Sequence, residues 1–176
     1  ASPRLAINRL RDPRWCEAWD RALAGTAGLR VRFAGSELGV LALRALQHGA
    51  THALCVERHP LDARIATGMV QKHFLGAWHA RHGDAIRGWT DDERRDSFED
   101  FTQAVDIAQA DAAGAAAPCD VVVFPGIDHT LLGTGLVPAL RAAHTADGGR
   151  PRVMPARATL YAMPIQWCYP DDEAGA

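Results

Sequence analysis

Apolar residues follow two different spacings along this chain, and the two spacings alternate. Short, mostly apolar runs, which are typical of strands buried in a sheet, stand at residues 29–34, 52–57, 77–84 and 119–124. Apolar positions three and four residues apart, which are typical of amphipathic helices, stand at residues 15–23, 38–48, 60–74 and 136–144. Strands that alternate with helices predict βαβ units with right-handed crossovers. The pattern therefore predicts an α/β fold, a three-layer sandwich with a mostly parallel sheet.

Residues 91–112 depart from this alternation. They are rich in charge and carry only a weak apolar stripe, which predicts an added helix. We expect an N-terminal helical segment, a core with a helical insertion, and an extended C-terminal segment. Their ranges are 1–28, 29–150 with the insertion at about 88–118, and 151–176.

Several candidate binding residues follow the predicted strands, where ligands of a parallel sheet bind. Gly35 and Gly39 stand between the first strand and the helix after it, which is the setting of a nucleotide-binding glycine loop. Glu57 ends the next strand, 22 residues after Gly35, and suits a carboxylate that accepts hydrogen bonds from ribose hydroxyls. Asp84 ends the third predicted strand. An ordinary strand–helix turn followed by a surface glutamate accounts for the loop and Glu57 equally well.

Three segments shift this balance, because they resemble, in the correct order, segments of the S-adenosylmethionine-dependent protein arginine methyltransferases. GVLALRALQHGATHALCVERHP (39–60) resembles motif I and post-I of that family, CDVVVFPGIDHTLLGTGLVPALRAAH (119–144) its fourth strand and substrate hairpin, and RVMPARATLYAMPI (152–165) its entry into a β-barrel. The resemblance implies a Rossmann-like class I methyltransferase fold with S-adenosylmethionine as the cofactor. It implies cofactor contacts at Gly35, Glu37, Gly39, Glu57 and Asp84. We expect the family's β-barrel to be largely absent.

Two residues of the glycine loop differ from the family's pattern of an acid followed by three alternating glycines. Phe33 stands where the family has the acid, and Glu37 stands where it has the middle glycine. A side chain at Glu37 takes up the space in which backbone approaches the ligand, and its carboxylate would face the carboxylate of the cofactor. The sequence therefore predicts a damaged cofactor site.

The segment that resembles the family's substrate hairpin also lacks residues on which the family's chemistry depends. Two glutamates of the family hold the substrate guanidinium there, and Pro125 and Thr130 stand at the matching positions. Neither residue supplies a carboxylate, so we expect no arginine methylation by the family's mechanism. Asp128 is kept beside His129, and these two are the candidate acid–base residues. A histidine that only bonds to the hairpin backbone is the alternative.

Composition and charge exclude several other classes of function. The formal net charge is −2, so no basic field would recruit nucleic acid. No apolar run reaches the ~18 residues that cross a bilayer, so no membrane contact is predicted. The four cysteines are scattered without a CxxC pair, which favours a reduced, cytoplasmic protein. His79 and His82, with Asp84 nearby, lack a spacing that brings three ligands together, so no metal site is predicted.

These observations favour a pseudo-methyltransferase domain with a structural or protein-interaction role, as part of a larger multidomain enzyme or beside a protein partner. Candidate anchors for such a partner are the five tryptophans, Trp15, Trp19, Trp78, Trp89 and Trp167. The alternative is a divergent S-adenosylmethionine-dependent methyltransferase acting on a small molecule. In that case Glu57 and Asp84 would bind the nucleoside, and His129 or Asp128 would lie near the substrate. The cofactor is S-adenosylmethionine in the second interpretation and absent in the first.

Overall fold

The computed structural model describes residues 3–109, 117–126 and 151–157, together with residues 137, 138, 140, 141 and 144. Its helices are α1 (Pro3–Leu10), α2 (Pro13–Leu23), α3 (Val40–Gln47), α4 (Pro60–His82) and α5 (Asp91–Thr102), with short 3-10 turns η1 (Ala24–Thr26) and η2 (Gly83–Gly88). Its strands are β1 (Arg30–Ala34), β2 (His52–Glu57), β3 (Val105–Gln109), β4 (Val121–Val123) and β5 (Arg152–Met154).

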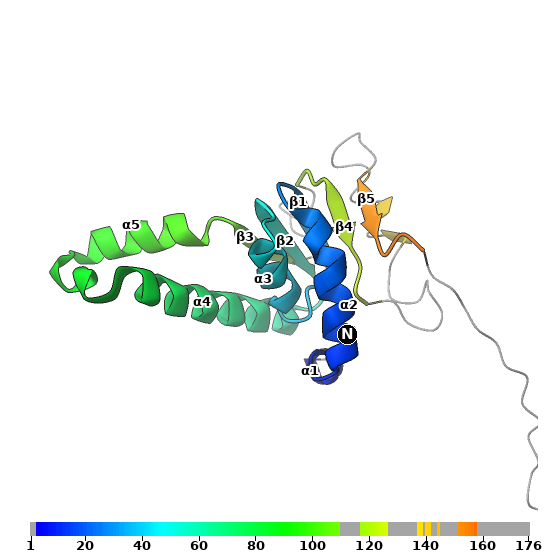
Figure 1. The fold of residues 1–176 in the computed structure, drawn as a ribbon, viewed down its shortest axis with the longest axis horizontal. Coiled ribbons are helices and arrows are strands. Elements are labelled where there is room, and N and C mark those ends of the chain that lie inside the picture. Colours follow the sequence, from blue (N-terminus) through cyan, green and yellow to red (C-terminus); the bar gives the residue numbers. More distant parts are fainter. Residues whose placement is uncertain are drawn as a thin grey trace, which may run out of the picture.

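The five strands form one parallel sheet in the order β3-β2-β1-β4-β5 (Figure 1). Val31 of β1 is in register with Ala53 of β2 on one side and with Val121 of β4 on the other. The predicted α/β class with a parallel sheet is therefore confirmed. Three of the four predicted strands are confirmed as well, namely those near residues 29–34, 52–57 and 119–124.

The two faces of the sheet carry alternate residues of each strand, as strand geometry requires. Phe33, Cys55 and Val123 lie on the face that α2 and α3 cover, and they form the largest apolar core with residues of those helices. Val122 points to the opposite face, where it packs against Leu140. Burial on both faces explains the continuous apolar run of β4, whereas β1 also buries the polar residue Arg32.

The prediction of a strand at 77–84 is wrong, because α4 continues as far as His82. Val70, Phe74 and Trp78 are buried at intervals of four residues, which is helical spacing. The Trp78 indole Nε1 donates a hydrogen bond of 3.1 Å to the Ser97 hydroxyl of α5, so its burial comes from a second helix and not from the sheet. The segment 77–84 contains only one of these three residues, so it does not show the four-residue spacing.

The third strand is β3, which lies inside the segment predicted as an added helix. The helix prediction for 91–112 is right for α5 and wrong for residues 105–109. Val105 pairs with Ala53 and Ile107 pairs with Cys55 at the edge of the sheet. No residue of this edge strand is fully buried: Val105, Ile107 and Ala108 are half-buried, and Asp106 and Gln109 are exposed. That weak alternation is easily mistaken for a helical stripe.

The first residues of the predicted extended C-terminal segment also belong to the sheet. Strand β5 pairs in parallel with β4, with Val153 opposite Val122. The remainder of the segment resembling the family's barrel strand, residues 158–165, lies outside the described residues. No helix in the described part of the chain combines the length and apolar character needed to cross a bilayer.

Candidate functional site

The candidate site lies at the carboxyl edge of the sheet, where the order of strands reverses. The chain proceeds from β1 through β2 to β3 on one side of the sheet, and β4 then returns to the other side of β1. Ligands of open α/β sheets bind in the crevice at such a reversal. The loop after β1 (residues 35–39) and Pro125, which follows β4, border this crevice.

The loop after β1 has the left-handed backbone that a glycine loop requires. Gly35 has a φ of 83° and Gly39 has a φ of 85°. The Gly35 N–H donates to the carbonyl oxygen of Val56 in β2 at 2.9 Å. Glu37 and Leu38 also have positive φ values, 49° and 63°, although neither is a glycine. The loop therefore keeps the glycine conformation with non-glycine residues, at a cost of about 1–2 kcal/mol for each.

Glu37 is held by an ion pair that crosses from the loop to α1. The Arg9 guanidinium Nη1 lies 2.8 Å from Glu37 Oε1, and the side chains are 19% and 4% exposed. The same Nη1 lies 3.5 Å from the carbonyl oxygen of Pro125. Arg9 thus bridges the loop after β1 and the residue after β4. Glu37 Oε2 is buried and has no hydrogen-bond partner among the described residues.

Glu57, the acid at the end of β2, is turned into the same loop. Its Oε1 accepts hydrogen bonds from the Ser36 backbone N–H at 2.8 Å and from the Ser36 hydroxyl at 2.5 Å. The Ser36 hydroxyl oxygen in turn accepts from the Gly39 N–H at 2.8 Å. All three residues are in the interior, and Glu57 is only 5% exposed. One carboxylate oxygen of Glu57 therefore fixes the loop.

This chain is similar to several solved structures of methyltransferases. A Trypanosoma brucei PRMT1 enzyme–prozyme heterotetrameric complex with AdoHcy aligns with a TM-score of 0.53 and 15% identity, over 80% of this chain and 38% of that chain. PRMT6 with SAH aligns with a TM-score of 0.58 and 14% identity, over 86% and 46%. Protein arginine methyltransferase 10 of Arabidopsis thaliana aligns with a TM-score of 0.53 and 16% identity, over 79% and 34%. The chain has a methyltransferase-like fold.

The predicted resemblance of the fold is confirmed by these structures, and the chain spans less than half the length of each. No protein-family model matches the sequence, and no curated protein matches it. Identities of 14–16% establish the fold alone.

Phe33 and the predicted site residue Asp84 contribute no polar group to the loop. Phe33, which stands where the resemblance implies an acid, is fully buried in the core with Val31 and Leu41. The placement of Asp84 at a strand end is wrong, because Asp84 lies in η2 with an 85% exposed side chain, 3.0 Å from Arg87. The 23 residues of α4 separate it from β2, which is about 34 Å of helix.

The candidate acid–base residues Asp128 and His129, and Thr130, lie outside the described residues. Trp167 also lies outside them. Within the described ranges, no group of three histidine, cysteine or carboxylate side chains could hold a metal ion. Sequence reasoning missed Arg9 and Ser36 as members of the site. Their partners, Glu37 and Glu57, lie 28 and 21 residues away in the sequence, and no local motif signals such pairs.

The loop residues do not fit S-adenosylmethionine in this conformation of the methyltransferase-like fold. Glu37, which stands where the resemblance implies a glycine, is 6% exposed and pairs with Arg9. The Glu57 carboxylate, which would accept from ribose hydroxyls, is engaged with Ser36. Arg9 fills part of the space between the ends of β1 and β4.

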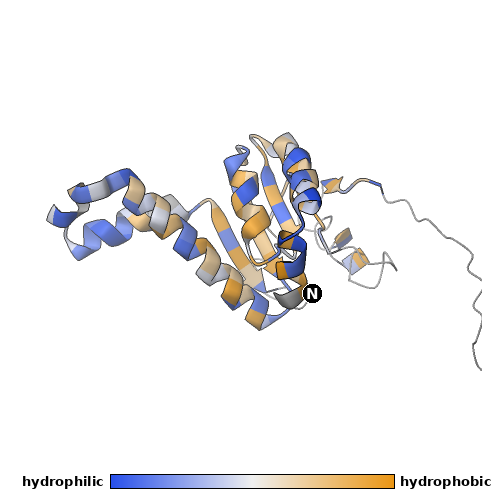
Figure 2. Ribbon diagram, turned by 60° about the horizontal axis from the view of Figure 1, so that its bottom comes forward, coloured by the Kyte–Doolittle hydropathy of each residue, from blue (hydrophilic) through white to orange (hydrophobic). Residues whose placement is uncertain are grey.

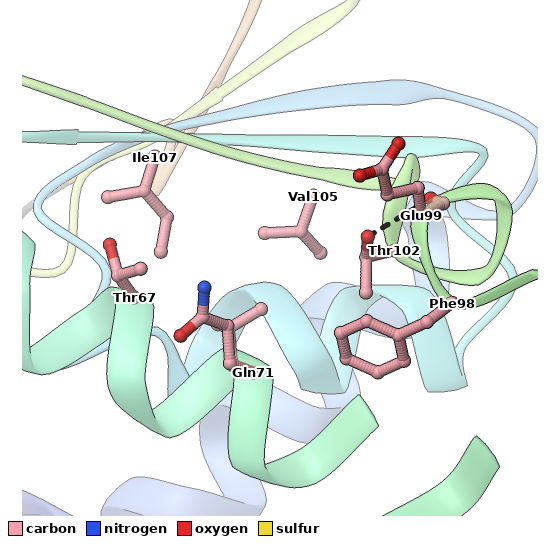
Figure 3. A pocket seen from close by; sticks show the side chains of 8 residues that line it. Thr67, Gln71, Phe98, Glu99, Thr102, Val105 and Ile107 are labelled. Atoms are coloured by element: carbon pink, nitrogen blue, oxygen red, sulfur yellow. Dashed lines mark hydrogen bonds between the residues drawn. The ribbon is translucent and has the colours of Figure 1, made fainter. Parts of the chain in front are cut away.

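A second hollow lies away from this loop, between α4, α5 and β3 (Figure 3). Its volume is about 410 Å³. Its lining combines apolar side chains with hydroxyl, amide and carboxylate groups, from Thr67, Val70, Gln71, Phe98, Glu99, Thr102, Val105 and Ile107. None of the loop residues borders it, so it is separate from the candidate cofactor site.

Proposed function

We propose that this chain is a pseudo-methyltransferase domain, whose cofactor site is closed by its own side chains and whose role is structural or protein-interacting. The observation that carries the proposal is the ion pair between Arg9 and Glu37. It connects α1 to the glycine loop at the crevice where a methyltransferase-like fold binds its ligand.

The charge on Glu37 supports the proposal. A cofactor that brings its own carboxylate to the loop would meet a buried carboxylate there, and like charges at close range cost several kcal/mol in a poorly solvated site. Arg9 compensates the charge of Glu37 within the chain through Oε1, while Glu37 Oε2 has no hydrogen-bond partner among the described residues. Opening the site would require breaking this ion pair and leaving both groups partly buried.

One observation favours a second candidate function, a divergent methyltransferase acting on a small molecule. Glu57 stays at the end of β2, and Gly35 and Gly39 keep the left-handed conformation of a cofactor loop. For this function the Glu57 carboxylate would accept hydrogen bonds from ribose hydroxyls in place of those from Ser36, and the ion pair between Arg9 and Glu37 would break.

Calorimetric titration with S-adenosylmethionine and S-adenosylhomocysteine distinguishes the two functions. We expect the unmodified chain to bind no better than high micromolar, roughly −5 kcal/mol. The variant Glu37→Gly should bind at least about tenfold more tightly, because it removes both the side chain and the charge. The matched control Asp84→Asn removes an exposed carboxylate far from the loop and should change nothing.

Phe33, which stands at the position of the family's acid, is not substituted in this experiment. Phe33→Asp would bury an unpaired carboxylate in the core. Low-micromolar binding by the unmodified chain, with methyl transfer to any acceptor, would contradict the proposal and establish the enzyme. Binding that Glu37→Gly leaves unchanged would show that Glu37 does not close the site.

A further inference from the structure

The hollow between α4, α5 and β3 lies where α4 leaves the sheet and α5 returns to it (Figure 1). Helix α4 follows β2, and α5 precedes β3, which pairs with β2 at the edge of the sheet. The volume of the hollow, about 410 Å³, falls within the range of small-molecule sites, about 300–1,000 Å³. No residue of the loop after β1 lines it, so a ligand bound here would be independent of the candidate cofactor site.

One wall of the hollow is apolar and continuous with the core. Val70 is 5% exposed and belongs to a core cluster. Phe98, Val105 and Ile107 are half-buried and pack against this cluster, and they border the hollow from α5 and β3. Figure 3 shows Val105 and Ile107 across the hollow from Gln71. An apolar ligand placed against these side chains removes their surface from water, which favours binding.

A contact further along the two helices holds this wall in place. The Trp78 indole Nε1 donates to the Ser97 hydroxyl at 3.1 Å. The Trp78 ring centroid lies 6.0 Å from that of Phe98, with the two rings nearly perpendicular. The Phe98 ring is therefore positioned before a ligand arrives, which lowers the entropic cost of binding. Trp78, expected as an anchor for a partner, is 4% exposed and belongs to this internal packing.

Two hydroxyl groups of the lining can only accept hydrogen bonds from a ligand. Thr67 Oγ1 donates to the Ala63 carbonyl oxygen at 2.9 Å. Thr102 Oγ1 donates to the Glu99 carbonyl oxygen at 3.0 Å (Figure 3). A hydroxyl has one hydrogen and two lone pairs, so each of these oxygens keeps only its capacity to accept. The two positions therefore favour ligand groups that carry hydrogens.

The remaining polar side chains add a negative charge to the lining. Glu99 contributes a carboxylate, which only accepts hydrogen bonds, and Gln71 contributes an amide, which accepts as well as donates. None of the described residues that line the hollow is a lysine, an arginine or a histidine. The hollow therefore offers acceptors and a negative charge, which complement a cation and repel an anion.

The charge of α5 acts in the same direction. Helix α5 contains six acidic and two basic residues, a formal charge of −4, and it is largely hydrophilic in Figure 2. Both of its arginines pair with aspartates of its first turn. The part that borders the hollow, residues 96–102, contains three acidic residues and no basic one. On α4, Arg64 and Lys72 stand close to the lining residues in the sequence, and neither borders the hollow.

We propose that this hollow binds a small organic amine, which has an apolar body and an ammonium group. The body would cover Phe98 and the half-buried residues of β3. The ammonium group would donate to the Glu99 carboxylate and to a lone pair of the Thr102 hydroxyl, as charge-assisted hydrogen bonds require. This inference goes beyond the proposed function, because the hollow and the glycine loop share no residue.

The probe is 2-phenylethylamine, and 3-phenylpropionate has the same ring and chain with the opposite charge. NMR titration of the 15N-labelled chain should show millimolar or tighter binding of the amine, with shift changes gathered at residues 67–71 and 98–107. The carboxylate should bind at least about fivefold more weakly. No shift change up to about 10 mM amine would overturn the inference. Equal affinities for the two compounds, or shift changes centred on residues 35–39, would also overturn it.

Glu99→Gln tests the charge. The variant should weaken binding of the amine about threefold to fivefold, because the carboxylate is exposed and partly screened by water. The matched control is Asp96→Asn, which removes an exposed carboxylate from the same helix outside the lining and should leave the affinity unchanged. Equal weakening by both variants would show a general attraction to α5 and would contradict a site at Glu99.

Gln71→Trp tests the hollow itself, because the indole would fill it. Gln71 is exposed on α4, so the variant should melt close to the unmodified chain, whereas binding of the amine should fall at least about tenfold. His73→Trp places the same side chain two residues further along, on the opposite side of α4, and should bind the amine normally. Equal losses in the two variants would contradict the site.

The variant Glu37→Gly separates this inference from the proposed function. It changes only the glycine loop, so it should bind 2-phenylethylamine as the unmodified chain does. A chain that does not bind the amine, but responds to the cofactor titration as expected, refutes only the amine site. A chain that binds the amine, and also binds S-adenosylmethionine tightly, refutes only the closed cofactor site.

Discussion

A Cβ atom placed on Gly39 would lie 2.8 Å from Cγ2 of Val70 and 3.3 Å from the carbonyl oxygen of Ala66. Both neighbours belong to α4, so the last glycine of the loop is where the start of α3 meets the next helix. Gly39 therefore serves the packing of the fold, independently of any ligand.

Gly39→Ala should destabilise the chain by about 2–4 kcal/mol, from the left-handed φ together with overpacking against Val70. Gly35→Ala is the matched control. Gly35 has nearly the same φ, but a Cβ on it would meet nothing within 4 Å, so strain alone should cost about 1–2 kcal/mol. Urea unfolding of both variants measures the loss in the free energy of unfolding for each. Equal losses would show that the contact with Val70 is relieved by a small shift of α4.

The Arg9–Glu37 ion pair should show strong coupling in a double-mutant cycle. Arg9→Met leaves the 4% exposed Glu37 carboxylate without its partner and should cost about 3 kcal/mol. Glu37→Gly should cost less, since it also relieves the positive φ of Glu37. The double variant should therefore be more stable than the sum of the single losses predicts, by about 2 kcal/mol.

A surface pair provides the control for this cycle. Arg95 and Asp92 lie 2.5 Å apart on α5 with side chains 63% and 79% exposed, and their coupling should stay below about 1 kcal/mol. Coupling at Arg9 and Glu37 no larger than this would mean that α1 detaches readily from the loop.

The sequence predicted the sheet because its central strands are buried on both faces. Val122 sits in a continuous β-branched run, as is typical of a strand covered on both faces, whereas Val31 is flanked by Arg30 and Arg32 and was found from its alternating pattern. Strand β3 was not predicted, because an edge strand shows only half of this pattern. The prediction of a strand at 77–84 was wrong for a related reason. Trp78 is buried by contact with α5, and its partner Ser97 lies 19 residues away, outside any local window of sequence.

The candidate site was predicted in part. Gly35, Gly39 and Glu57 could be found because a glycine loop and an acid at a fixed distance form a local motif. That Glu57 bonds to Ser36, and that Glu37 bonds to Arg9, follows from tertiary packing of α1 and β2 around the loop. No spacing rule connects an arginine in an N-terminal helix to a glutamate in a later loop.

Cys55 should resist alkylation in the native chain. Burial raises the pKa of the Cys55 thiol to about 12, with a minor opposing effect of a hydrogen bond with Ser36. At pH 8 only about one thiol in ten thousand would then be the reactive thiolate. Mass spectrometry after treatment with iodoacetamide should find Cys55 unmodified, and the half-exposed Cys16 modified. In urea both should react, and rapid native reaction of Cys55 would contradict its place in the core.

The pH dependence of stability should reveal the contact between α2 and α3. A hydrogen bond from Arg44 lowers the pKa of Asp20 below its ordinary value of 3.8, assisted by the nearby positive charge of Arg44. Because the pKa is lowered in the folded state, the pair contributes stability that is fully present above the unfolded pKa. This contribution is lost as the pH falls through the lower folded pKa.

Arg44→Met should therefore be less stable than the unmodified chain near pH 7, by less than about 1 kcal/mol because both side chains are partly exposed. The difference should shrink as the pH falls below the ordinary pKa of an aspartate, and it should vanish once Asp20 is protonated in both chains. Urea unfolding at a series of pH values measures the difference in the free energy of unfolding. Arg87→Met, in the exposed turn η2, is the control. A deficit that does not shrink at all as the pH falls would show that Arg44 stabilises α3 by the packing of its stem and not through Asp20.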